Sequence, residues 1–127
     1  MPAHGITISA GPVRVQAELG DTPTARAVLA ALPIDAVAST WGDEVYFEIP
    51  VSVEAEPDAR PEVEVGDLAY WPPGRALCIF FGPTPASDAS AAPRAASEVN
   101  LLGRITGDVA LFREVRDGDP IRVEAES

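Results

Sequence analysis

Residues 66–87 have the sequence GDLAYWPPGRALCIFFGPTPAS, in which two short segments flank a turn. The first segment, 67–71, runs into Pro72-Pro73-Gly74, and residues of these types favour a turn. The second segment, 76–81, is entirely apolar and is bounded by glycines. We therefore predict two strands, one on each side of the turn.

Alternating apolar and polar residues predict further strands before and after this stretch. In residues 45–53 the alternation is strongest, although Pro50 on the polar side indicates an edge position or a bulge. Residues 5–19 alternate in the same way around Gly11-Pro12, which predicts an N-terminal hairpin. Residues 99–105 and 121–125 complete the set of apolar strand candidates.

Two short helices and one long loop connect these strands. Asp21-Thr22-Pro23 places a capping side chain before a proline, which predicts a helix that ends at Pro33. Asp108 is expected to cap a second short helix. Residues 82–97 are rich in Pro, Ala and Ser without a hydrophobic period, so we expect a loop there.

These elements predict the fold class and the domain organisation. About eight short strands with two short helices favour a mainly β fold, a closed and mostly antiparallel barrel capped by the helices, because closure removes exposed sheet edges. The length fits one domain, residues 1–127.

Composition excludes several classes of function. The chain has 20 acidic and nine basic residues, a net charge of −11, and no Lys. Phosphate binding depends on clustered cations, so nucleic acids and anionic membranes are poor partners. The chain lacks an apolar run long enough for a spanning helix and begins without a signal-peptide pattern, so we expect a cytoplasmic protein.

Few residues are suited to covalent or metal-dependent chemistry. His4 is the only histidine, and the chain has a single cysteine, Cys78, so neither a metal nor another cofactor is expected. Cys78 lies within an apolar strand, and we expect its thiol to be buried and inert. Asp43 and Glu44 are adjacent and would face opposite sides of a strand, so they do not form an acid pair, although Glu44 alone is a candidate general base.

Aromatic residues are concentrated between Trp41 and Phe81. Both tryptophans, both tyrosines and three of the four phenylalanines occur there, which indicates a stacking cleft, although filling the core and covering the ends of the barrel is the alternative role. The candidate ligand-binding residues are Tyr46, Tyr70, Trp71, Phe80 and Phe81, with polar contacts from Arg75, Thr84, Ser87 and Asn100. Arg75 could meet a carboxylate, a phosphate or a carbonyl group, and its alternative is a surface ion pair.

Three segments resemble the small prokaryotic cyclophilin-like domain family: residues 40–47 (TWGDEVYF), residues 66–87 and Val99-Asn100. The resemblance extends from about Gly5 to Ala125. It implies a closed, mainly antiparallel eight-stranded barrel with a helix over each end, and it implies no established activity. The Phe-His-Arg run, the Gln-Gly-Gly segment and the proline pocket of true cyclophilins are missing here, so no isomerase residue is transferred to this chain.

The leading hypothesis is a binding module whose ligand is a small organic acid or a peptide segment, in a monomer or weak dimer. The loop at 82–97 is expected to border the cleft and to close over the ligand. The alternative is an enzyme, either a divergent peptidyl-prolyl isomerase that uses Arg75 or a small-molecule hydrolase or isomerase that uses Glu44. A third hypothesis is an interaction subunit whose acidic surface docks a basic partner.

Overall fold

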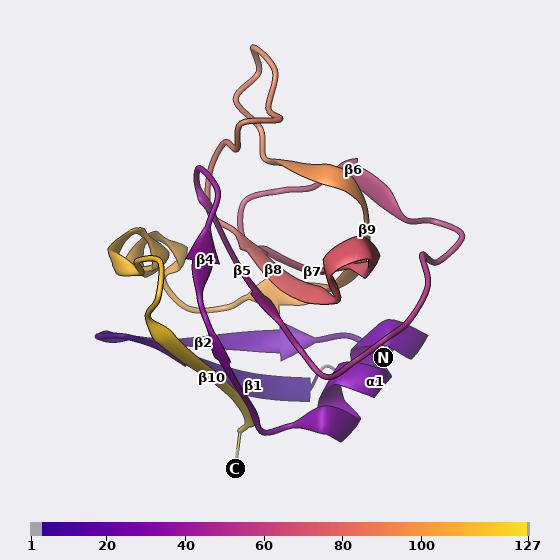
Figure 1. The fold of residues 1–127 in the computed structure, drawn as a ribbon, viewed down its shortest axis with the longest axis vertical. Coiled ribbons are helices and arrows are strands. Elements are labelled where there is room, and N and C mark those ends of the chain that lie inside the picture. Colours follow the sequence, from indigo (N-terminus) through magenta and orange to yellow (C-terminus); the bar gives the residue numbers. More distant parts are fainter. Residues whose placement is uncertain (1–3, 127) are drawn as a thin grey trace.

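The structure is a computed structural model that describes residues 4–126, and it consists mainly of antiparallel strands (Figure 1). The described residues form ten strands: β1 (His4–Ala10), β2 (Val13–Leu19), β3 (Ile34–Val37), β4 (Ser39–Thr40), β5 (Glu44–Glu48), β6 (Arg60–Glu62), β7 (Asp67–Trp71), β8 (Ala76–Phe80), β9 (Arg94–Ile105) and β10 (Pro120–Ala125). They also form the α-helix α1 (Pro23–Ala31) and the 3₁₀ helices η1 (Pro72–Gly74) and η2 (Val109–Glu114).

The strands form an open sheet. Its order is β3-β10-β1-β2-β9-β7-β8-β5-β4, and β6 pairs with β9 beside this path. Between the end strands β3 and β4 the described residues contain no ladder of hydrogen bonds, so the prediction of a closed barrel with eight strands is wrong in closure and in strand number. The mainly β architecture and the antiparallel pairing are confirmed.

The sheet stays open because one bend separates its two end strands. Only Ala38 lies between β3 and β4, and its backbone bonds to the turn before β10. The N–H of Ala38 donates to the carbonyl oxygen of Asp119 at 2.8 Å, and the N–H of Gly118 donates to the carbonyl oxygen of Ala38 at 2.9 Å. The chain therefore leaves β10 at this residue and continues as the neighbour of β5, so the two ends of the sheet meet at a bend of the backbone.

Both predicted helices are present with their predicted caps. The Thr22 hydroxyl accepts a hydrogen bond from the N–H of Ala25 at 3.1 Å, and Pro23 occupies the first turn of α1. The Asp108 carboxylate accepts from the N–H of Ala110 at 3.0 Å and begins η2. The larger of two clusters of buried side chains among the described residues is called the main core here. Helix α1 packs against it through the buried side chain of Val28, and η2 through that of Phe112.

The N-terminal hairpin shows how alternation builds this core. Along β2 every second residue is buried, and β1 pairs with β2 from His4 to Ala10 as predicted. Strands β5, β7 and β8 contribute Val45, Phe47, Leu68, Leu77 and Ile79 to the same core. The inward face of the sheet is therefore continuous from the hairpin to β5.

A second, smaller core lies on the outer face of β5, β7 and β8. Its buried residues are Val63, Ala69, Ala76, Cys78, Phe80, Ala95 and Val99. β6 and the first half of β9, which pair with each other, provide the cover above this face, as seen in the upper part of Figure 1. Strand β8 thus has all five residues buried, because both of its faces are covered.

Two element boundaries differ from the predictions. The strand predicted at 45–53 ends at Glu48, just before Pro50, which has no N–H for a ladder. The loop predicted at 82–97 ends earlier, because β9 already begins at Arg94. Ala95 is buried in the second core, whereas residues 96–98 are exposed, and this interruption of the alternation hides the strand in the sequence.

Candidate functional site

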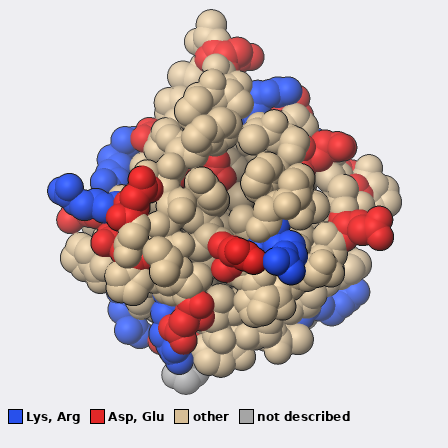
Figure 2. Space-filling model, viewed as in Figure 1, with Lys and Arg blue, Asp and Glu red and all other residues tan. Residues whose placement is uncertain are grey.

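A cavity of about 240 Å³ opens within the second core, and we call it the inner pocket. Its lining residues are Trp41, Glu44, Tyr46, Trp71, Cys78, Ala95, Ala96 and Val99. They come from β5, β7, β8, β9 and the turn before β5. Figure 2 shows that the face containing this site is hollowed, with largely uncharged walls and charged side chains around the rim.

Strand register places Glu44, Tyr46 and Cys78 on one face of the sheet. Tyr46 pairs directly with Cys78 across β5 and β8, and Glu44 is two residues from Tyr46 along the strand. Side chains two residues apart share a face, and diagonal neighbours on paired strands lie close enough to contact each other. The carboxyl, the phenol and the thiol therefore belong to the same pocket wall.

Glu44 is the unusual residue of this wall. Its side chain is buried, with a residue exposure of only 5%, and no Arg among residues 4–126 forms an ion pair with it. Burial raises the pKa of the Glu44 carboxyl from 4.5 to about 7, and a hydrogen bond with the Cys78 thiol opposes part of that rise. Near neutral pH this carboxyl can therefore either donate or accept a proton.

Cys78 lies beside Glu44 on the same wall of the pocket. Its side chain is buried, which confirms that part of the prediction, and its Sγ approaches the carbonyl oxygen of Ala76 at 3.9 Å. Burial raises the pKa of the Cys78 thiol well above its usual range, and the neighbouring Glu44 carboxylate adds to the rise. The thiol therefore stays protonated at neutral pH and acts as a hydrogen-bond donor rather than a nucleophile.

Trp71 is held in place on the opposite side of the pocket. Its indole N–H donates to the Ser97 hydroxyl at 2.7 Å, which connects the end of β7 to β9. A Cβ atom added at Gly74 would lie 2.7 Å from two atoms of the indole ring, so the ring packs directly against this glycine. The Pro72-Pro73-Gly74 turn therefore fixes the position of the Trp71 side chain.

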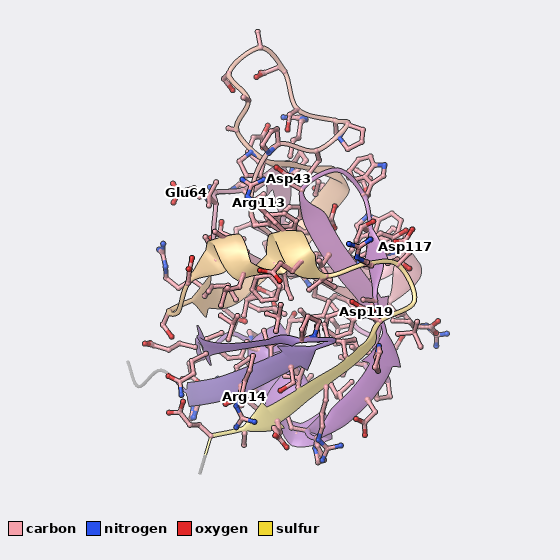
Figure 3. The ribbon with its side chains drawn as sticks, turned by 90° about the vertical axis from the view of Figure 1, so that its left-hand side faces the viewer. Arg14, Asp43, Glu64, Arg113, Asp117 and Asp119 are labelled. Carbon is pink, nitrogen blue, oxygen red and sulfur yellow. The ribbon has the colours of Figure 1, made fainter. Side chains whose placement is uncertain are left out.

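Trp41 is positioned by a turn that is bonded to the rest of the protein. Its N–H donates to the carbonyl oxygen of Glu44, and the N–H of Asp43 donates to the carbonyl oxygen of Pro83, both at 2.9 Å. The Asp43 carboxylate also pairs with Arg113 of η2 at 3.4 Å, and Figure 3 shows these two side chains next to each other. Gly42 adopts a φ of +61°, a conformation that favours glycine at this turn.

A wider and more open depression of about 670 Å³ adjoins the inner pocket, and we call it the outer pocket. Tyr46 and Trp71 line both pockets, whereas Arg75 lines only the outer one. Arg75 pairs with Glu48 at 3.0 Å, and both side chains are largely exposed. Exposed ion pairs of this kind contribute little to stability. The pair with Glu48 therefore does not prevent Arg75 from contacting a ligand at the rim of the outer pocket.

The structure therefore brings together three of the nine predicted binding residues, Tyr46, Trp71 and Arg75, around the two pockets. Tyr70 faces the main core instead, where its hydroxyl donates to the carbonyl oxygen of Val51 at 2.6 Å. Phe80 is buried in the second core without lining the inner pocket. Phe81 stacks on Phe112 with ring centroids 6.4 Å apart, below the Arg113 guanidinium.

The other three predicted polar residues, Thr84, Ser87 and Asn100, hold segments of the chain together. Thr84 is buried, its hydroxyl donates to the carbonyl oxygen of Arg94, and the Ser87 hydroxyl accepts from the N–H of Thr84 at 2.9 Å. The Asn100 amide accepts from the N–H of Glu56 at 2.8 Å and donates to the carbonyl oxygen of Glu54 at 3.0 Å. These groups are occupied by contacts within the protein.

Five lining residues are absent from the binding residues predicted from the sequence: Trp41, Cys78, Ala95, Ala96 and Val99. Glu44 is predicted only as a candidate general base. The pairing of Tyr46 with Cys78 is the missing information, because alternation shows which residues share a face but not which strands are neighbours. The expected loop borders the inner pocket only through Ala95 and Ala96, which belong to β9.

Comparison with known proteins places this chain and its fold in a known family. The chain belongs to the cyclophilin-like family, whose model matches residues 4–124. It is similar to the hypothetical protein AF2241 from Archaeoglobus fulgidus, which has a solution structure. The two chains are 41% identical with a TM-score of 0.83, over 98% of this chain and 95% of that chain.

No curated protein matches the chain. The helices among the described residues are all too short or too polar to cross a membrane. The family and the solved relative thus support the fold, and the chemistry of the site has to be argued from its residues.

Proposed function

We propose that this protein binds a small organic molecule in the inner pocket, with Glu44 as its main polar contact. The observation that supports this proposal most directly is the buried Glu44 carboxyl at the wall of an apolar cavity. A buried carboxyl without a cationic partner is costly, and such groups concentrate where a ligand or a reaction uses them.

The size and walls of the inner pocket support a ligand smaller than a drug. Pockets for drug-sized molecules have about 300–1,000 Å³, whereas this cavity has about 240 Å³. Its walls combine aromatic rings with small apolar side chains, and a few polar atoms at one side would orient the ligand. The organic acid expected from the sequence would find a basic partner, Arg75, only in the outer pocket.

The proposal is testable because the only two tryptophans of the chain, Trp41 and Trp71, both line the inner pocket. A set of small-molecule fragments can therefore be screened by intrinsic fluorescence. The Ala96→Leu variant fills part of the pocket from an exposed position, and Ala89→Leu is a matched control on an exposed loop residue outside both pockets.

Fragments that quench or shift the fluorescence of the wild type should lose most of their affinity for the Ala96→Leu variant and keep it for the Ala89→Leu variant. Equal affinity for the two variants, or a screen without any hit, would contradict a ligand site in the inner pocket.

A second candidate function is proton transfer by Glu44 on the bound molecule, as in an isomerase. The carboxyl has a pKa of about 7, so it exchanges a proton readily at neutral pH, as an efficient general base requires. A fragment found in the screen would then exchange a carbon-bound hydrogen for deuterium in D₂O in the presence of the protein. The Glu44→Gln variant should bind the fragment without this exchange, and exchange that continues in the variant would exclude Glu44 as the base.

A further inference from the structure

We propose that the inner pocket recognises an organic ammonium cation, which lies against the rings of Trp41, Tyr46 and Trp71 and beside the Glu44 carboxylate. This inference rests on the proposed function, because it names the class of ligand for the same pocket.

The aromatic walls are the first argument. Three of the eight lining residues are aromatic, and two of them are tryptophans, the side chain whose ring face attracts cations most strongly. They come from three separate places: the turn before β5, the middle of β5 and the end of β7. Rings from different sides around one cavity form the kind of cage that binds quaternary ammonium groups.

The Trp71 ring and the turn that carries Trp41 are held in place before any ligand enters. Trp71 is held by Ser97 and Gly74, and the turn that contains Trp41 is bonded to the backbone at Pro83. A preformed cage loses less conformational entropy on binding than flexible side chains would. The cavity therefore needs little rearrangement to accept a cation.

Charge is the second, independent argument. Glu44 is the only acidic residue among those that line the inner pocket, and neither Arg nor His is among them. Burial keeps the Cys78 thiol protonated and therefore uncharged. Asp43, which precedes Glu44 in the sequence, does not line the inner pocket and forms an ion pair with Arg113. An anionic ligand would face a carboxylate without a compensating cation, whereas an ammonium group would neutralise it.

The remaining surroundings suit the alkyl groups of such a ligand. Ala95, Ala96, Val99 and Cys78 provide small apolar contacts. The whole chain has a net charge of −11, so its field attracts cations toward the surface and opposes the approach of anions. An ammonium ion with methyl or short alkyl substituents therefore matches the walls, the carboxylate and the charge of the molecule.

Choline and its neutral carbon analogue 3,3-dimethyl-1-butanol form the matched pair of probes, because they share a shape and differ in the charge. The indole N–H signals of Trp41 and Trp71 in a ¹⁵N–¹H NMR spectrum report binding of either probe. At pH 8, where Glu44 is ionised, choline should bind about tenfold more tightly than the alcohol, as expected from a desolvated cation on aromatic rings.

Two carboxamide variants test the role of the carboxylate. Glu44→Gln should weaken choline binding about tenfold and leave the alcohol unchanged. Glu48→Gln is the matched control, because Glu48 lies four residues further along β5 and lines only the outer pocket. It should leave both affinities within about twofold, since exposed charges are screened.

The outcomes separate the two proposals. Equal binding of choline and the alcohol, with no effect of Glu44→Gln, would overturn recognition of a cation and leave the pocket as a site for neutral molecules. Failure of both probes to move either indole signal at tens of millimolar would contradict recognition of a cation, and the fragment screen then decides whether the pocket binds small molecules at all. Weaker choline binding in Glu48→Gln and Glu44→Gln alike would assign the effect to the general charge of the surface and also contradict the cage.

Discussion

The Glu44 carboxyl makes the stability of the folded protein depend on pH. Because burial raises its pKa from 4.5 to about 7, the folded state binds the proton more tightly than the unfolded state. The favourable contribution of the protonated carboxyl is complete below pH 4.5 and is lost as the pH rises through about 7. A rise of this size corresponds to about 3 kcal/mol, since one pKa unit is about 1.4 kcal/mol.

We predict that the Glu44→Gln variant removes this dependence, because its amide does not ionise. The free energy of unfolding in urea should fall from pH 5 to pH 8 by about 2.5 kcal/mol more in the wild type than in the variant. Only the difference between the two proteins is interpreted, since the other carboxyl groups titrate equally in both. Parallel pH profiles would show that Glu44 is well solvated in the folded protein.

The contact between Gly74 and Trp71 supports a second prediction at the scale of residues. In Gly74→Ala the new methyl group would overlap the indole ring, whose atoms lie 2.7 Å from the Cβ position. The ring then has to move and lose its hydrogen bond to Ser97, which should cost about 1–3 kcal/mol and shift the tryptophan emission. Urea unfolding and fluorescence measure both effects.

Gly20→Ala is the control for this variant, because its Cβ would lie 3.6 Å from the nearest atom, an ordinary contact. Its stability and emission should stay close to those of the wild type. An unchanged emission spectrum in Gly74→Ala would show that the glycine does not position the indole.

At the scale of elements, the features that depend on a local sequence pattern were predicted, whereas those that depend on pairing between distant strands were not. The hairpin of β1 and β2 and the capped start of α1 follow from alternation and from Thr22-Pro23 alone. The start of β9 and the pairing of β6 with β9 depend on the outer face that they cover, and no local pattern encodes it. The bend at Ala38, which leaves the sheet open, depends likewise on contacts with the turn before β10.

The same reasoning explains which part of the site was predictable. Neighbouring residues of a strand face opposite sides, so Tyr70 and Trp71 cannot both line one pocket on the sheet. In the structure Tyr70 faces the main core and Trp71 the outer face. Alternation therefore limits the candidates to one of each such pair, and strand pairing decides which one faces the pocket.

Asn100 links three elements, which predicts a large effect of its removal. Its amide bonds to the backbone of residues 54 and 56 and to the Thr24 hydroxyl at the start of α1. Asn100→Ala leaves these buried groups without their partner and should destabilise the protein by about 3 kcal/mol. Glu98→Ala changes an exposed residue of the same strand and should stay within about 0.5 kcal/mol of the wild type in urea unfolding. Equal stabilities of the two variants would contradict the linking role of Asn100.

For the molecule as a whole, charge is the dominant feature outside the core. The net charge is −11, and the six ion pairs among the described residues involve only five of the nine arginines. Asp117 and Asp119, both labelled in Figure 3, are only two residues apart on the turn before β10, so like charges also gather locally. Repulsion among carboxylates destabilises the compact state, because the unfolded chain keeps its charges further apart.

We therefore predict that salt stabilises this protein at neutral pH. Raising NaCl from about 0.1 M to about 1 M shortens the screening length from roughly 10 Å to roughly 3 Å. The free energy of unfolding at pH 7 should then increase on the order of 1 kcal/mol, because repulsion weakens more than the few exposed ion pairs do. The same salt series near pH 4.3, where the net charge of the chain is close to zero, is the control and should show little change. An equal gain at both pH values would assign the effect to salt acting on apolar surface, and a loss at pH 7 would mean that the ion pairs outweigh the repulsion.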